Sequence, residues 1–149
     1  MVVPPLLFIF KHIFTVKQPV IPVEVKTEAE AKVAAFNKQY KKQHQILFRG
    51  RFGYLSRMDK PNKATAAAFQ MAARLLGMQH IFQALTGPVE TKIGRLVWNG
   101  DPNHWIFDPF RYSSETYETT GEMAMFMPGA KELDGTVEGA MRAGLELYP

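Results

Sequence analysis

The stretch that decides the expected fold is TEAEAKVAAFNKQYKKQHQILFR, residues 27–49. Its apolar residues recur at spacings of three and four, which is the pattern of an amphipathic helix. Thr27 and Glu30 fit a capping box, in which a threonine and a glutamate three residues later satisfy free backbone amides. The pattern predicts a helix over about residues 28–48 with lysines on its outer side. The apolar stripe consists of Ala29, Val33, Phe36, Tyr40, His44 and Leu47.

The rest of the chain predicts a second long helix and little other regular structure. Gly87-Pro88 is a strong stop signal, so the second helix is expected over about residues 60–86. Its apolar residues lie on two sides, which indicates packing on both sides, with the first helix as one neighbour. The turn at residues 99–102, Asn-Gly-Asp-Pro, predicts a β-hairpin over about residues 89–107. A short C-terminal helix capped by Asp134 completes a mainly α fold.

We expect three segments along the chain. Residues 1–26 form an extended, apolar and proline-rich arm, residues 27–88 a helical core, and residues 89–149 a loop-rich extension with the hairpin and the last helix. The arm is expected to dock on another subunit or at a membrane surface, because its apolar side chains cannot stay free in water. These arm-docking residues are Leu6, Leu7, Phe8, Ile9, Phe10, Ile13 and Phe14.

Composition excludes several functional classes. The chain of 149 residues has no cysteine, which excludes a disulfide scaffold, a cysteine-ligated metal and thiol catalysis. No apolar run reaches the roughly 18–20 residues of a membrane span. The four histidines lack a metal-ligand spacing, and no nucleotide-binding motif occurs. We therefore predict no catalytic, cofactor-binding or metal-binding residues, no cofactor, no secretory signal and no evident cleavable presequence.

Positive charge is concentrated in the first part of the chain. Residues 1–63 carry 12 Lys or Arg and 4 Asp or Glu, whereas residues 64–149 carry 6 and 10. This asymmetry indicates a polyanionic partner for the first part. We expect an acidic protein surface or phospholipid head groups, with RNA less favoured, although a basic–aromatic loop at residues 49–57 also suits phosphate contact and base stacking. The predicted contact residues are Lys38, Lys41, Lys42, Arg49, Arg51, Phe52 and Tyr54.

One polar cluster is a candidate for chemistry. His104 stands between Asp101 and Asp108 in the sequence, and a histidine between two carboxylates can act as an acid–base group. Both aspartates precede a proline, however, where aspartate commonly serves turn formation. The turn is the interpretation that we favour.

These patterns lead to three functional hypotheses. The favoured one is a non-enzymatic accessory or structural subunit of a large multi-protein assembly, located peripherally at the mitochondrial inner membrane, in a respiratory complex or the ATP synthase. The alternative is a subunit of a ribosome, mitochondrial or other, or of another ribonucleoprotein, which uses the basic segment 32–63. The third is a small enzyme with the Asp101 and His104 site.

Overall fold

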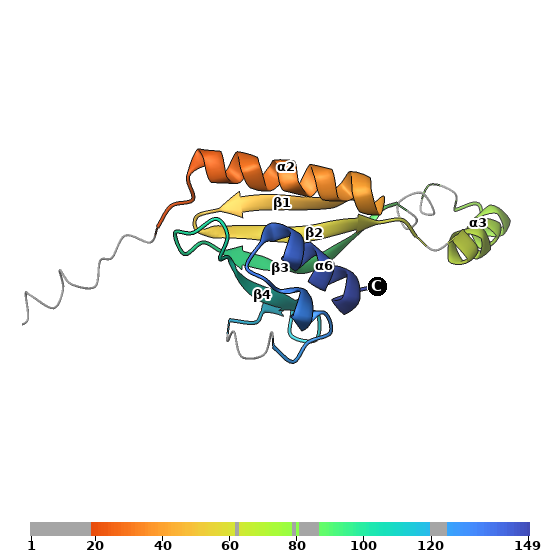
Figure 1. The fold of residues 1–149 in the computed structure, drawn as a ribbon. Coiled ribbons are helices and arrows are strands. Elements are labelled where there is room, and N and C mark those ends of the chain that lie inside the picture. The colour runs from red at the N-terminus through yellow and green to blue at the C-terminus, as the bar shows by residue number, and fades with distance from the viewer. Residues whose placement is uncertain (1–18, 62, 79, 81–86, 120–124) are drawn as a thin grey trace, which may run out of the picture.

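The computed structural model describes residues 19–61, 63–78, 80, 87–119 and 125–149. Within them the chain forms a five-stranded antiparallel sheet whose strands lie side by side in the order of the sequence. Helices α2 and α6 share a single hydrophobic core with one face of this sheet, and α3 extends from one end (Figure 1). The predicted mainly α fold is therefore wrong.

Helix α2 (Val23–Tyr40) is shorter than the predicted helix and begins earlier. It starts directly after Pro22, so residues 23–26 of the predicted arm belong to its first turn. The capping box does not form, since the Thr27 hydroxyl donates to the carbonyl oxygen of Val23 at 3.0 Å inside the helix. The helix ends where Lys41 adopts a left-handed conformation with φ of 53°. Residues 1–18, and with them all arm-docking residues, lie outside the described residues.

Strands β1 (His44–Arg49) and β2 (Phe52–Asp59) replace the end of the predicted first helix and the predicted basic–aromatic loop. Buried and half-buried residues alternate with exposed ones along β1, which is the period of a strand with one face covered. The spacings from Tyr40 to His44 and from His44 to Leu47 are four and three residues, which fit a helix by chance. This coincidence extended the predicted helix into the residues of β1. A two-residue hairpin loop joins the strands, and Gly50 supplies its positive φ of 58°.

Strands β3 (Val89–Val97) and β4 (Ile106–Arg111) are antiparallel neighbours, so the predicted hairpin is confirmed. The strand pairing extends beyond the predicted hairpin, because β4 continues to Arg111 and pairs with β5 (Thr116–Tyr117). β3 also pairs with β2 along its length. The sheet thus joins strands from the predicted helical core and from the predicted loop-rich extension.

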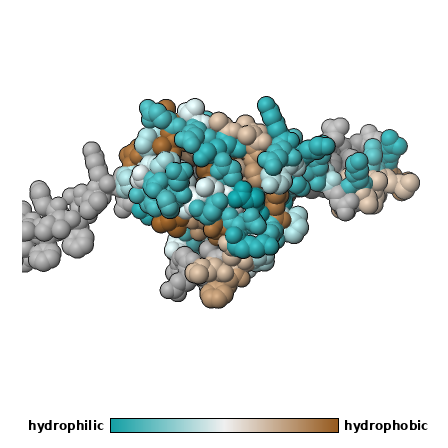
Figure 2. All heavy atoms as spheres, viewed as in Figure 1, coloured by the Kyte–Doolittle hydropathy of each residue, from teal (hydrophilic) through white to brown (hydrophobic). Residues whose placement is uncertain are grey.

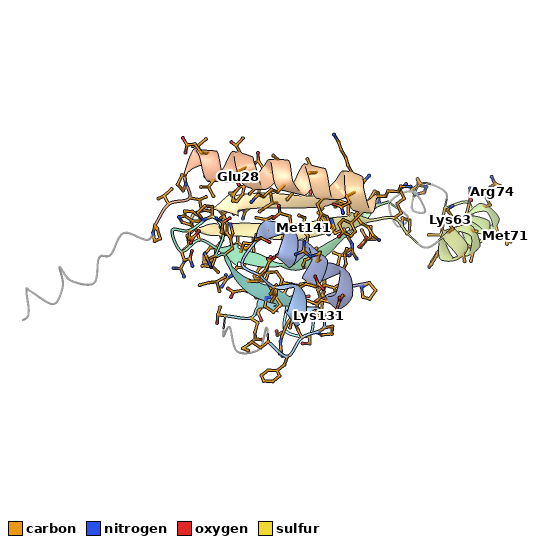
Figure 3. All side chains as sticks on the ribbon, in the orientation of Figure 1. Glu28, Lys63, Met71, Arg74, Lys131 and Met141 are labelled. Atoms are coloured by element: carbon orange, nitrogen blue, oxygen red, sulfur yellow. The ribbon has the colours of Figure 1, made fainter. Side chains whose placement is uncertain are left out.

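Helix α3 (Lys63–Leu76) lies within the predicted second helix and ends at Gly77, whose φ is 66°. Residues 62, 79 and 81–86 of that prediction lie outside the described residues. The first helix is not its neighbour, contrary to expectation. Instead α3 extends away from the sheet between β2 and β3, with Met71 and Arg74 at the end of the molecule (Figures 1 and 3).

The short 3-10 helix η1 (Ala130–Glu132) leads into α6 (Val137–Leu147), which confirms the predicted C-terminal helix. Its cap is Thr136 rather than Asp134: the Thr136 hydroxyl oxygen accepts a hydrogen bond from the Gly139 amide at 3.0 Å. Asp134 instead accepts from the backbone amide of Thr136 at 3.0 Å, which holds the cap in place. Met141 of α6 is fully buried between this helix and the sheet.

The position of a leucine on one or the other side of the sheet determines how much its replacement by alanine lowers stability. Leu55 on β2 is 1% exposed in the core, whereas Leu47 on β1 is 55% exposed on the other side. We expect Leu55→Ala to lower the free energy of unfolding by about 2–5 kcal/mol, and Leu47→Ala to change it by less than about 0.5 kcal/mol. Urea denaturation followed by circular dichroism measures both. Equal losses would contradict the one-sided core.

Candidate functional site

The face of the sheet opposite α2 and α6 is not covered by a described helix or strand, and we call it the open face. Residues from all five strands alternate onto it and bring together aromatic rings, cations and amide or hydroxyl groups. Strand pairing places these residues in adjacent rows, because paired residues of neighbouring strands point to the same side. The open face includes Gln45, Leu47 and Arg49 of β1, Phe52, Tyr54 and Ser56 of β2, Glu90, Lys92 and Arg95 of β3, and Tyr117 of β5.

The structure divides the predicted contact residues into two groups at opposite ends of β1. Lys38, Lys41 and Lys42 lie at the C-terminal end of α2, just before β1 begins. The others lie at or next to the β1–β2 hairpin, where β1 ends: Arg49, Arg51, Phe52 and Tyr54. Since Phe52 and Tyr54 are two residues apart on a strand, both point to the open face. The predicted set is therefore not one surface.

Arg95 lies at the centre of the open face. No pattern in the sequence indicates this position. Its guanidinium lies 4.3 Å from the centre of the Phe52 ring and 5.3 Å from that of Tyr117. Its Nε donates to the Asp108 carboxylate at 2.9 Å, and the side chains of this ion pair are 17% and 5% exposed. Arg95 and Asp108 are partners in the β3–β4 register. The Asp108 carboxylate compensates the charge of the guanidinium, which remains a cation and contacts two aromatic rings.

The Tyr117 side chain extends from β5, at the edge of the sheet, over the open face to Tyr54 of β2. Its ring centre lies 5.4 Å from that of Tyr54 at an interplanar angle of 65°, and 5.0 Å from that of Phe110. Burial and the neighbouring Tyr54 raise the pKa of the Tyr117 hydroxyl, which therefore stays a neutral donor at pH 7. The nearby Lys92 ammonium lies 5.0 Å from the centre of the Phe110 ring.

A trough runs between these groups on the open face. Its volume is about 460 Å³, and its lining includes Tyr54 and Tyr117, with side chains from β1 on one side and from β3 at one end. The Gln45 amide donates to the Ser56 hydroxyl at 3.0 Å and lies 3.4 Å from a Glu90 carboxylate oxygen. This size lies within the range of small-molecule sites.

The candidate acid–base cluster is divided in the structure. The His104 ring nitrogen Nδ1 lies 2.6 Å from the Asp101 carboxylate, and these side chains are 72% and 49% exposed. Asp101 also accepts from the Asn103 backbone amide at 2.9 Å, as expected of a turn residue. Asp108 is paired with Arg95 instead. Across the part of the chain that the structure describes, no group of three His, Asp or Glu could hold a metal ion, and no helix is long and apolar enough to cross a membrane.

A second polar cluster lies inside the protein, on the side of the sheet that carries the helices. His44 is 4% exposed, and its backbone amide and Nδ1 lie 2.7 and 3.2 Å from the Asn37 side-chain oxygen. Its neighbour Arg57 is 2% exposed and donates to Asp59 at 2.7 Å and to the Tyr148 carbonyl oxygen at 2.7 Å. Burial, and next the Arg57 guanidinium, lower the pKa of His44 to about 4, so the imidazole is neutral at pH 7.

No family model, curated protein or solved structure matches this chain.

The buried His44 predicts a pH dependence of stability. Its pKa is about 4 in the folded protein against 6.5 for an ordinary histidine, so the unfolded chain binds more protons between these values. Stability should therefore fall as pH drops from about 6.5 to about 4, by up to about 3 kcal/mol. Urea denaturation at a series of pH values measures this loss. We expect His44→Gln to remove this part of the dependence and His104→Gln, at an exposed histidine, to retain it. An unchanged dependence in His44→Gln would refute the assignment.

Proposed function

We propose that the chain is a non-enzymatic, structural subunit of a larger protein assembly, in which a partner protein covers α3. The observation that carries this proposal is the exposure of the apolar side chains of α3. Phe69 is 52%, Met71 71%, Leu75 83% and Leu76 71% exposed. Figure 2 shows apolar residues at the surface of this helix, next to hydrophilic ones.

Apart from Thr65, the polar residues of α3 form a narrow stripe. At 100° per residue, Lys63, Gln70 and Arg74 fall within a short arc, and alanine, phenylalanine, methionine and leucine occupy most of the remainder. A helix at the surface of a monomer normally shows the opposite balance, with its apolar stripe turned toward its own core. The wide apolar arc therefore favours a helix that another protein surrounds on more than one side.

The free energy gained by burying the exposed side chains of α3 is comparable with the cost of associating two proteins. Fully burying a large apolar side chain contributes about 1.5–3 kcal/mol, so the four exposed ones contribute roughly 6–12 kcal/mol together. Association costs an estimated 4–15 kcal/mol in lost freedom of motion. α3 also has only 14 residues, a length at which an isolated helix is marginally stable in water. A partner that covers α3 would stabilise the helix and hold the chain at the same time.

The proposal includes the assembly expected from the sequence. Attachment to a respiratory complex or the ATP synthase at the mitochondrial inner membrane is supported by the apolar character of residues 6–14 and of α3. Phospholipid head groups are further proposed partners of the lysines at the end of α2. The ribonucleoprotein alternative has less support, because the basic residues it requires are divided between the two ends of β1. The enzyme hypothesis loses the third residue of its cluster, since Asp108 pairs with Arg95.

Self-association of the purified full chain tests this proposal. Without its partner the wild type should form oligomers or aggregates through α3, measured by size exclusion with light scattering at several concentrations. Met71→Asp combined with Leu75→Asp should give a monomer, because a charge cannot be buried in an apolar contact without a large cost. Val20→Asp is the matched control, since Val20 is 74% exposed but lies outside α3. A monomeric wild type, or equal effects of the control, would contradict the proposal.

A further inference from the structure

The trough on the open face has the composition of a ligand site rather than of an ordinary solvated sheet surface. The solvated side of an antiparallel sheet is normally polar. Here two partly buried tyrosines, Tyr54 and Tyr117, border a concavity of about 460 Å³. Pockets of roughly 300–1,000 Å³ with aromatic walls and a few polar groups are typical of small-molecule sites.

The aromatic rings offer surfaces for stacking. Tyr54 and Tyr117 meet edge to face, at an interplanar angle of 65°, so their ring faces are not stacked on each other. Arg95, which is fixed by its ion pair with Asp108, also contacts the Tyr117 ring. A planar ring that enters the trough can therefore pack against tyrosines whose positions are already set. Such stacking contributes about 1–3 kcal/mol per nucleobase in single-strand-binding proteins.

The charges in the trough favour an anion. Arg49 and Lys92 contribute to its lining from β1 and β3, and both side chains are exposed. Among the described residues, no carboxylate pairs with either cation. Glu90 is the single acidic residue of the lining, and its carboxylate lies 3.4 Å from the Gln45 amide. Arg49 carries a planar guanidinium, which matches the oxygens of a phosphate with two parallel hydrogen bonds.

We propose that this trough binds a nucleoside phosphate, with the base against Tyr54 and Tyr117 and the phosphate at Arg49. A free nucleotide and a nucleotide at the end of a single-stranded nucleic acid share this chemistry. The site is independent of α3, so its occupancy does not depend on the proposed role of that helix.

Calorimetric titration of the full chain tests the site with three probes: AMP, adenosine and a six-residue oligoadenylate RNA. AMP should bind with a dissociation constant below about 1 mM, and adenosine more weakly, since it lacks the phosphate. If the oligonucleotide binds at least ten times more tightly than AMP, the ligand is the end of a single-stranded nucleic acid. If the two affinities are equal, the ligand is a free nucleotide.

Three variants test which residues contact the phosphate and which contact the base. Arg49→Gln should weaken AMP at least five-fold and leave adenosine unchanged, whereas Tyr54→Leu should weaken both probes. Lys38→Gln is the matched control, because it removes an exposed positive charge at the other end of β1, and it should leave AMP binding unchanged. Circular dichroism melting checks that each variant is folded. The proposal would be overturned if neither 10 mM AMP nor 1 mM oligonucleotide binds. Equal losses of AMP affinity in Arg49→Gln and Lys38→Gln would also overturn it.

Discussion

Ile93, near the middle of β3, is fully buried, and a Cβ atom placed on Gly144 of α6 would lie only 2.6 Å from it. Only a glycine therefore allows α6 to approach the sheet this closely. With α6 in that position and α2 beside it, the apolar residues of one side of the sheet are buried in a single core. Among the residues that the structure describes, no helix covers the other side, and this asymmetry determines which of their surfaces are available to a partner.

Two of the surfaces that the described residues present differ in chemistry. α3 extends from the β2–β3 connection and exposes mainly aliphatic and aromatic carbon, which suits a protein that excludes water from it. The open face instead combines tyrosine rings with arginine and lysine, and its central ion pair between Arg95 and Asp108 is largely buried. A charged pair in such a position fixes the aromatic rings that surround it. The first surface fits attachment to an assembly, and the second fits recognition of a small or terminal group.

The sequence predicted the elements whose pattern is local. The β3–β4 hairpin has a strong turn signal, and α6 and most of α2 have regular apolar spacing. The prediction failed at residues 44–59, where three- and four-residue spacings concealed the alternation of His44, Ile46 and Phe48. The open face could be predicted only in part: Arg49, Phe52 and Tyr54 lie close together in the chain. Arg95 and Tyr117 join them through pairing across strands, which a single sequence does not reveal.

Cross-linking across the β1–β2 hairpin tests whether residues 44–59 form strands of a sheet with one open face. The chain has no cysteine, so an engineered pair can be followed by thiol titration without background. Gln45 and Ser56 are register partners, and paired residues of antiparallel strands have Cα atoms about 4.5–5.5 Å apart, which a disulfide can bridge. Gln45→Cys with Ser56→Cys should therefore lose both thiols under mild oxidation, whereas Gln45→Cys with Leu55→Cys, on opposite faces, should keep them. Retention of both thiols in the first pair would contradict this account.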